Sequence, residues 1–170
     1  TFCSLREAIT NANNDLATSA DCTAGSGNDT IVCAGGVTTI TLGSTLPNIT
    51  DTDGLTIDGG ADVTISGNNL YRILIVDNGI PLTLQHLTVA DGMVVSAIGA
   101  GIINSGTLTI TNSIVSGHSS SLGGGIYNSG TLTITDSTFS DNNSTSYGGG
   151  ISNSGTLTIT NSSFSGNTSG

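Results

Sequence analysis

The closest group of carboxylates in the chain is formed by Asp51, Asp53, Asp58 and Asp62. Two carboxylates held at a set separation hydrolyse glycosidic bonds, and a cluster of carboxylates binds calcium. Aspartate next to Gly or Thr also favours a corner of the chain. Because no EF-hand or nonapeptide spacing accompanies these residues, we interpret them as turn residues, with a loose calcium site as the alternative.

The two histidines, His86 and His118, could act as general bases, but each stands alone in its part of the sequence. In the repeats described below, His118 occupies the position of Asn142 and Asn167, which predicts a structural corner. The spacing indicates no set of Ser, His and Asp for nucleophilic catalysis. We therefore expect no catalytic residue, no cofactor and no metal, and a carbohydrate-active enzyme is the third of our functional hypotheses.

Threonine alternates with Leu and Ile in the segment Thr-Leu-Thr-Ile-Thr, which occurs three times. In a strand, alternate side chains share one face, so these threonines would form ranks of hydroxyl and methyl groups. Ice-binding solenoids present such ranks, and a glycan could also bind them. The alternative is that Thr simply suits the solvent-facing side of a strand. The candidate binding face comprises Thr107, Thr109, Thr131, Thr133, Thr156 and Thr158.

The three cysteines, Cys3, Cys22 and Cys33, lie near the start of the chain and form no CxxC metal pattern. A local disulfide in an oxidising compartment fits them best, and one thiol is then left over. Three single bridges are possible, and the spacing does not choose among them.

Charge and hydropathy restrict the partners. The 170 residues carry 12 acidic side chains and only two basic ones, Arg6 and Arg72, for a net charge of −10. Such a chain repels nucleic acid and anionic membranes, and no apolar run approaches the ~18 residues of a spanning helix. The first residue is Thr1 rather than Met, which is typical of a processed chain. We expect a secreted or cell-surface protein.

Internal repetition predicts the fold. The segment from Asn104 to Thr111 returns at 128–135 and 153–160. Neighbouring copies must stack to bury the apolar face, and each period holds three short strand-like stretches separated by turn residues. The absence of a helical segment in the repeat argues against a leucine-rich repeat. We predict an all-β, single-stranded, right-handed parallel β-helix with coils of ~24 residues, roughly six in all. Its inward residues include Ile126, Leu132, Ile134 and Phe139.

Two parts of the chain are expected. Residues 1–29 form a capping helix and a Cys-containing loop, and residues 30–170 form the β-helix, with regular repeats from about 99 to 170. Ser4 and Glu7 make a capping box for a helix of about ten residues, which covers one end of the core. The column Asn112, Asp136 and Asn161 is predicted to form a ladder of hydrogen-bonded side chains at a corner.

The last repeat ends without a comparable cap. An uncovered strand edge is a template for further pairing, so we expect either further chain beyond Gly170 or a docked partner. The candidate assembly edge comprises Ile151, Leu157, Ile159 and Phe164.

Two motifs resemble known families. The run from Cys3 to Ala8, Cys-Ser-Leu-Arg-Glu-Ala, resembles the motif of the CSLREA domain of bacterial surface proteins. The run Gly123 to Asn128, followed by Thr131 to Ile134, is similar to the repeat of polymorphic outer membrane proteins and related β-helix surface proteins. This resemblance implies an exported repeat protein that acts as a surface scaffold or adhesin, and it implies no reaction.

The leading hypothesis is therefore a non-enzymatic extracellular structural protein, adhesin-like or filament-forming, that associates end to end or with other surface components. A binding module that uses the Thr-rich face for glycans or ice is the second. In neither case do we expect nucleic-acid binding or direct insertion of this segment into a membrane.

Overall fold

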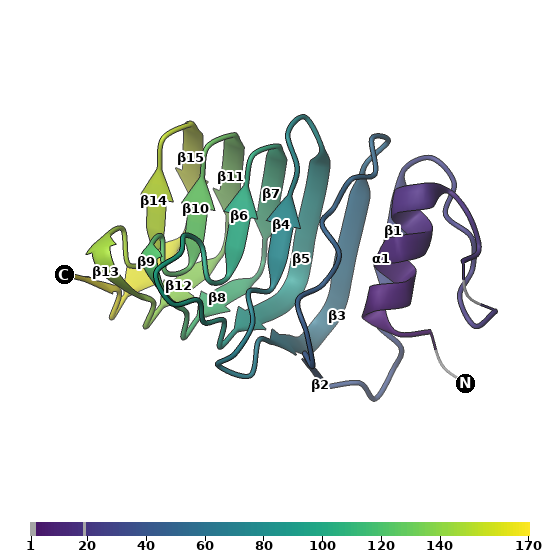
Figure 1. Ribbon diagram of the computed structural model, residues 1–170, viewed down its shortest axis with the longest axis horizontal. Coiled ribbons are helices and arrows are strands. Elements are labelled where there is room, and N and C mark those ends of the chain that lie inside the picture. Colours follow the sequence, from purple (N-terminus) through teal and green to yellow (C-terminus); the bar gives the residue numbers. More distant parts are fainter. Residues whose placement is uncertain (1–2, 19) are drawn as a thin grey trace.

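The computed structural model describes residues 3–18 and 20–170, without the side chains of residues 61 and 62. The chain is a parallel β-solenoid of about six turns with one short helix at its N-terminal end (Figure 1). The predicted fold class is confirmed, with turns of ~25 residues. The elements are α1 (Leu5–Asn14), β1 (Asp29–Val32), β2 (Thr39–Thr41), β3 (Leu55–Ser66), β4 (Leu74–Val76), β5 (Pro81–Ala90), β6 (Ile102–Asn104), β7 (Thr107–Thr111), β8 (Ile114–Ser116), β9 (Ser119–Leu122), β10 (Ile126–Asn128), β11 (Thr131–Thr135), β12 (Thr138–Ser140), β13 (Asn143–Tyr147), β14 (Ile151–Asn153), β15 (Thr156–Thr160), β16 (Ser163–Ser165) and β17 (Thr168–Ser169).

Three parallel sheets run along the solenoid. The largest contains β1, β2, β3, β5, β7, β8, β11, β12, β15 and β16, the second contains β4, β6, β10 and β14, and the third contains β9, β13 and β17. A regular coil therefore holds four short strands, not the three that we predicted. The fourth strand, β13, consists of Asn, Ser, Thr and Tyr. It lacks the aliphatic alternation by which a half-buried strand is recognised.

The core consists of columns of like side chains, one from each coil. Leu132 pairs in register with Leu108 and Leu157, and Ile134 pairs with Ile110 and Ile159. The predicted inward residues Ile126, Leu132, Ile134 and Phe139 are all fully buried. Stacking branched side chains at the spacing of the strands removes apolar surface from water in every coil.

A corner with left-handed backbone conformation separates the two halves of the main sheet in each regular coil. His86 occupies this corner in β5 with φ 53°, and Asn112, Asp136 and Asn161 occupy it in the later coils with φ between 47° and 49°. Asn and Asp tolerate this conformation better than most residues. The predicted side-chain ladder at Asn112, Asp136 and Asn161 is wrong, because these side chains lie outside the core and none makes a side-chain hydrogen bond within the described chain.

The ladders lie instead in two other columns. Asn104 Nδ2 donates to Asn128 Oδ1, and Asn128 Nδ2 donates to Asn153 Oδ1, both at 2.6 Å. Asn104 and Asn128 are fully buried at the end of their strands. The chain is turning there, and the amide groups also donate to carbonyl oxygens of the next coil, Asn104 to Thr131 and Asn128 to Thr156.

The second ladder begins with a histidine. The backbone N–H of His118 donates to Asn142 Oδ1 at 3.2 Å, and Asn142 Nδ2 donates to Asn167 Oδ1 at 2.8 Å. The predicted corner position of His118 in the column of Asn142 and Asn167 is thus confirmed. Its ring is buried, and burial lowers the pKa of His118 to about 4, so the imidazole is neutral at pH 7.

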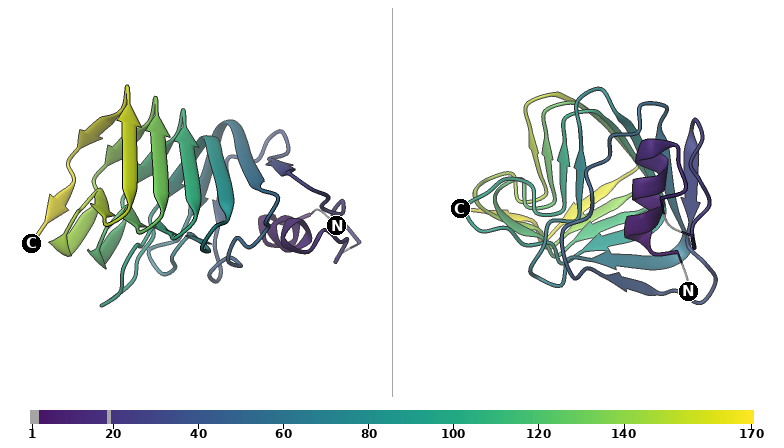
Figure 2. Two further views of the ribbon diagram at one scale, coloured as in Figure 1. Left: turned by 90° about the horizontal axis from the view of Figure 1, so that it is seen from above. Right: turned by 45° about the vertical axis from the view of Figure 1, so that its right-hand side comes forward.

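Helix α1 lies across the N-terminal end of the solenoid (Figure 2). The predicted capping box is confirmed: Ser4 Oγ accepts from the Glu7 N–H, and the Glu7 carboxylate accepts from the Ser4 N–H at 2.9 Å. The pKa of Glu7 is lowered by these hydrogen bonds. Leu5, Ile9 and Ala12 are buried and join the core of the first coils, so the helix covers part of the cross-section that the first coil would otherwise expose.

Candidate functional site

The candidate binding face lies on the outer side of β7, β11 and β15. Thr109, Thr133 and Thr158 stand directly beside one another in the parallel register. The same column continues through Thr83 and Thr56 to Thr30 in β1, so that six threonines follow one line along the solenoid. The sequence repeat indicated only three of the six threonines, because the residues that flank strands β1, β3 and β5 differ from the residues that flank the repeated segment.

Two flanking columns complete this face, which we call the threonine face. One contains Thr107, Thr131 and Thr156, and the other contains Thr111, Thr135 and Thr160. Within the described chain, no hydroxyl group of these nine threonines makes a hydrogen bond to protein, in contrast to the amides of the internal ladders. The hydroxyls are therefore available to water or to a ligand.

The candidate assembly edge lies at the other end of the solenoid from α1 (Figure 1). Ile151 and Leu157 are partly buried, whereas Ile159 and Phe164 are each 43% exposed. Phe164 stacks on Phe139 with 4.9 Å between the ring centroids. Each of these side chains continues a column that is fully buried one coil earlier, so the last coil presents the cross-section of the core to solvent.

The acidic residues of the sequence do not form one site. Asp51 is buried at 4% exposure and Asp53 is exposed. Asp58 lies on the outer surface, where it accepts from the Gly60 N–H and from Gln85 Nε2. These hydrogen bonds lower the pKa of Asp58, with a further contribution from His86. The side chain of Asp62 lies outside the described residues, and the calcium site considered at these four positions is not assembled from the other three.

His86 and His118 lie in different surroundings. His86 Nδ1 is 3.1 Å from Asp58 Oδ1 in a partly exposed pair, which contributes little stability because solvent screens it. His118 is enclosed: Nδ1 accepts from the Gly92 N–H at 2.8 Å and Nε2 donates to the Val89 carbonyl at 3.0 Å. Both ring nitrogens are used in holding neighbouring coils, which assigns His118 a structural role.

The two arginines are also bound to backbone. Arg6 Nη2 donates to the Ser44 carbonyl at 2.9 Å and so joins the helix to the second coil. Arg72 donates to the carbonyls of Ile98 and Gly99, both at 2.7 Å, and its burial lowers the pKa of the guanidinium. The sequence pattern does not indicate these contacts, because the carbonyl acceptors lie 26 to 38 residues away along the chain.

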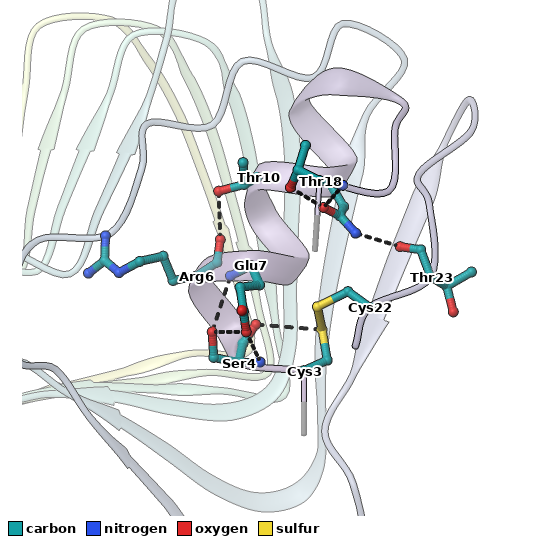
Figure 3. The surroundings of a disulfide bond; sticks show 9 residues. Cys3, Ser4, Arg6, Glu7, Thr10, Thr18, Cys22 and Thr23 are labelled. Atoms are coloured by element: carbon teal, nitrogen blue, oxygen red, sulfur yellow. Dashed lines mark hydrogen bonds between the residues drawn. A yellow bond between two sulfur atoms is a disulfide. The ribbon is translucent and has the colours of Figure 1, made fainter. Parts of the chain in front are cut away.

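The cysteines form one disulfide, between Cys3 and Cys22, which joins the residue before the capping box to the loop after α1 (Figure 3). The side chain of Asn11 fixes the same loop, since its Nδ2 donates to the Thr23 carbonyl and its Oδ1 accepts from Thr18. Cys33 carries a free thiol. Burial, followed by the charge of Asp58, raises the pKa of Cys33, so it is a poor nucleophile.

A broad groove of about 1130 Å³ opens between α1 and the first coil. Leu5 and Ala8 of the helix line one side, and Ile31 and Ile40 line the other. The helix therefore covers the first coil only in part. No group of three or more His, Cys, Asp or Glu side chains within the described chain is arranged to hold a metal.

Comparison with known proteins identifies no relative: no family model, curated protein or solved structure matches the chain. The assignment to the solenoid fold therefore rests on the register and the repeat alone. None of the helices described is long and apolar enough to cross a membrane.

Proposed function

We propose that this chain is a non-enzymatic structural solenoid that associates end to end through its last coil. The observation that carries the proposal is the exposure of Ile159 and Phe164, at 43% each, in columns whose preceding members Ile134 and Phe139 are fully buried. A coil of similar sequence placed on this surface would bury Ile159 and Phe164. These two side chains cover Ile134 and Phe139 of the preceding coil in the same way. Apolar burial drives such association, and an unpaired parallel strand edge gives it a direction.

Sedimentation velocity over a range of concentrations tests this proposal. We expect the wild-type chain to form larger species as concentration rises, and negative-stain electron microscopy to show rods of increasing length. The double variant I159K/F164K should remain a monomer. The control V95K replaces an apolar residue that is 84% exposed elsewhere, and it should associate as the wild type does. A wild-type chain that stays monomeric at every concentration would contradict the proposal.

An extracellular or cell-surface location is part of this proposal. It is supported by the Cys3–Cys22 disulfide, which is typical of oxidising compartments, and by the resemblance of the N-terminal motif and the repeat to bacterial surface proteins. Adhesion to other surface components is proposed on the same resemblance.

The threonine face supports a second candidate function, binding of an extended glycan or of ice. The specific observation is the unbroken column of six threonines from Thr30 to Thr158, together with hydroxyls that make no hydrogen bond to the described protein on β7, β11 and β15. Parallel strands set the spacing along this column at about 4.8 Å, which gives a repeating ligand a regular series of equivalent contacts.

Two tyrosine variants distinguish this second function from simple solvation of a strand. T133Y places a large ring in the middle of the threonine face, and we expect it to abolish binding in an ice-affinity or insoluble-polysaccharide pull-down. T138Y places the same ring on β12, where the Thr138 hydroxyl already pairs with Ser163, and it should bind as the wild type does. Equal binding by both variants would refute a role for the threonine face.

A further inference from the structure

The two core columns that end at Ile159 and Phe164 begin at the other end of the solenoid. One runs in register from Ile31 in β1 through every coil to Ile159. The other runs from Ile40 in β2 to Phe164. Ile31 and Ile40 are partly buried, and both line the groove beside α1. The same two columns are thus incompletely covered at both ends of the molecule (Figure 1).

The strand edges at the two ends match as well. Within the described chain, β1 and β2 each pair with β3 alone, and β15 and β16 each pair only with the equivalent strand of the preceding coil. All four strands belong to the same parallel sheet. An edge strand has unpaired N–H and C=O groups along one side, and these can pair with another chain. A second copy placed on the axis of the first can therefore continue this sheet in the same direction.

Helix α1 and Asp29 limit which columns can continue from one copy to the next. The helix joins the core of the first coils and closes its own part of the cross-section. Asp29, rather than a leucine, begins the column that ends at Leu157, and its Oδ1 accepts from the Ser26 N–H of its own loop. Leu157 is partly buried in the last coil, whereas Ile159 and Phe164 are exposed. The columns left open beside α1 are therefore the ones with exposed side chains at the other end.

Charge favours the last coil as the occupant of the groove beside α1. No residue from 142 to 170 is charged, whereas Asp21 and Asp29 line the groove. These carboxylates repel an acidic occupant but not an uncharged one. Since each chain carries a net charge of −10, most contacts between two copies bring like charges together. A contact through the last coil avoids this repulsion.

We propose that the N-terminal end of one copy receives the last coil of a second copy. Ile31 of the receiving copy covers Ile159 of the other, and this contact removes apolar surface from water. Ile40 covers Phe164 in the same way. The inference rests on the proposed end-to-end association and names its acceptor surface. Because the two contact surfaces differ, each addition leaves a free surface at both ends, and the product is a filament rather than a closed dimer.

Disulfide crosslinking between copies tests this register. Thr30 and Thr158 lie at the two ends of one outward column, and both are exposed. In the proposed contact they stand on adjacent parallel strands about 4.8 Å apart, which is within the Cα separations that a disulfide spans. The variants T30C and T158C, each made with C33S to remove the free thiol of Cys33, should form a crosslinked heterodimer when they are mixed and oxidised.

The matched control is T107C, also made with C33S. Thr107 is exposed as well, but it lies in β7 in the middle of the solenoid. Intact-mass analysis should find at least about tenfold less heterodimer from T107C with T158C than from T30C with T158C, because only the second pair is brought within disulfide distance. Equal yields from the two mixtures, or a product formed mainly between two T158C chains, would overturn the proposed register.

An acceptor variant separates this inference from the proposed function. I31K/I40K changes only the N-terminal end, and we expect it to be monomeric alone in sedimentation velocity. Mixed with I159K/F164K, it should form a one-to-one complex that grows no further, because each variant keeps the surface that the other lacks.

The outcomes for the two proposals differ. A wild-type chain that stays monomeric would contradict both. A wild-type chain that associates while T30C and T158C fail to crosslink would overturn this inference and leave end-to-end association through the last coil in place. Because T30C, T158C and T107C change exposed threonines, this conclusion does not depend on the folding of I31K/I40K, which a thermal melt checks separately.

Discussion

Replacing Asn128 with alanine should be among the most destabilising changes of a polar residue in this protein. The Asn128 side chain is fully buried. It accepts one hydrogen bond from Asn104, and its Nδ2 lies within hydrogen-bond distance of Asn153 Oδ1 at 2.6 Å, the Thr156 carbonyl at 3.1 Å and the Gly130 carbonyl at 3.2 Å. The change therefore breaks contacts to the coils on both sides of its own.

The expected cost follows from those contacts. A typical buried hydrogen bond contributes about 1 kcal/mol, and a buried group left without a partner costs about 1–3 kcal/mol. We expect N128A to lower the free energy of unfolding by about 3 kcal/mol. N153A is the matched comparison, because Asn153 is exposed, donates to the Gly155 carbonyl and accepts from Asn128 Nδ2. Since Asn128 Nδ2 keeps the Thr156 and Gly130 carbonyls as acceptors and water can replace the Gly155 contact, N153A should cost about 1 kcal/mol or less.

Equilibrium unfolding in urea, followed by circular dichroism, measures both variants. N128V provides a further test, because it keeps most of the side-chain volume and removes only the polar groups. Val76 precedes Asn104 in the same column, so the fold accepts valine in this orientation. A cost for N128A no larger than that for N153A, or wild-type stability in N128V, would show that the ladder does not stabilise the solenoid by hydrogen bonding.

Three further predictions concern other columns and the cap. Since the pKa of His118 is about 4 in the folded chain, below the ordinary histidine value of 6.5, the unfolded chain takes up the proton first as the pH falls. This contribution to stability is complete above pH 6.5 and falls as the pH drops towards 4. Wild type should therefore lose about 3 kcal/mol more than H118N between pH 7 and pH 4, and equal losses in urea titrations would contradict this. F139A should cost about 3–5 kcal/mol because the ring is fully buried, and F164A, which removes a ring that is 43% exposed, should cost less than half as much by the same assay. The double variant C3S/C22S removes a crosslink between residues 19 apart, which is worth about 3 kcal/mol. We expect hydrogen exchange to increase in α1 but not in β11, and a uniform increase would show that the cap and the coils unfold as one.

The apolar pattern was sufficient to predict the core. Each inward position that we assigned in the second regular coil is fully buried, because Thr-Leu-Thr-Ile-Thr permits only one orientation of the strand. The capping box was predictable for a similar reason, since Ser4 and Glu7 act on backbone groups within one turn. Where the determining contact is local or strictly periodic, one sequence carries enough information.

Polar columns are less predictable, because periodicity alone does not say which way a side chain points. Asn104, Asn128 and Asn153 have the same period as Asn112, Asp136 and Asn161, yet only the first set forms a ladder. The second set forms no ladder because its residues occupy the left-handed corner, where their side chains lie outside the core. One chemical signal was present in the sequence: Asp136 is a carboxylate, and an ionised carboxylate has no N–H to donate to the next coil. A continuous ladder needs an amide in every coil, as the first set has.

The candidate sites show the same division between periodic and non-periodic information. The threonine face was found because it repeats, although its extension to Thr30 required the register of β1. Asp29 was overlooked as a core-facing residue because it stands where the repeat has leucine, in a coil that the repeat does not describe. A carboxylate placed in a leucine column makes that coil less stable by itself, and the repeat, which describes only the later coils, does not reveal it.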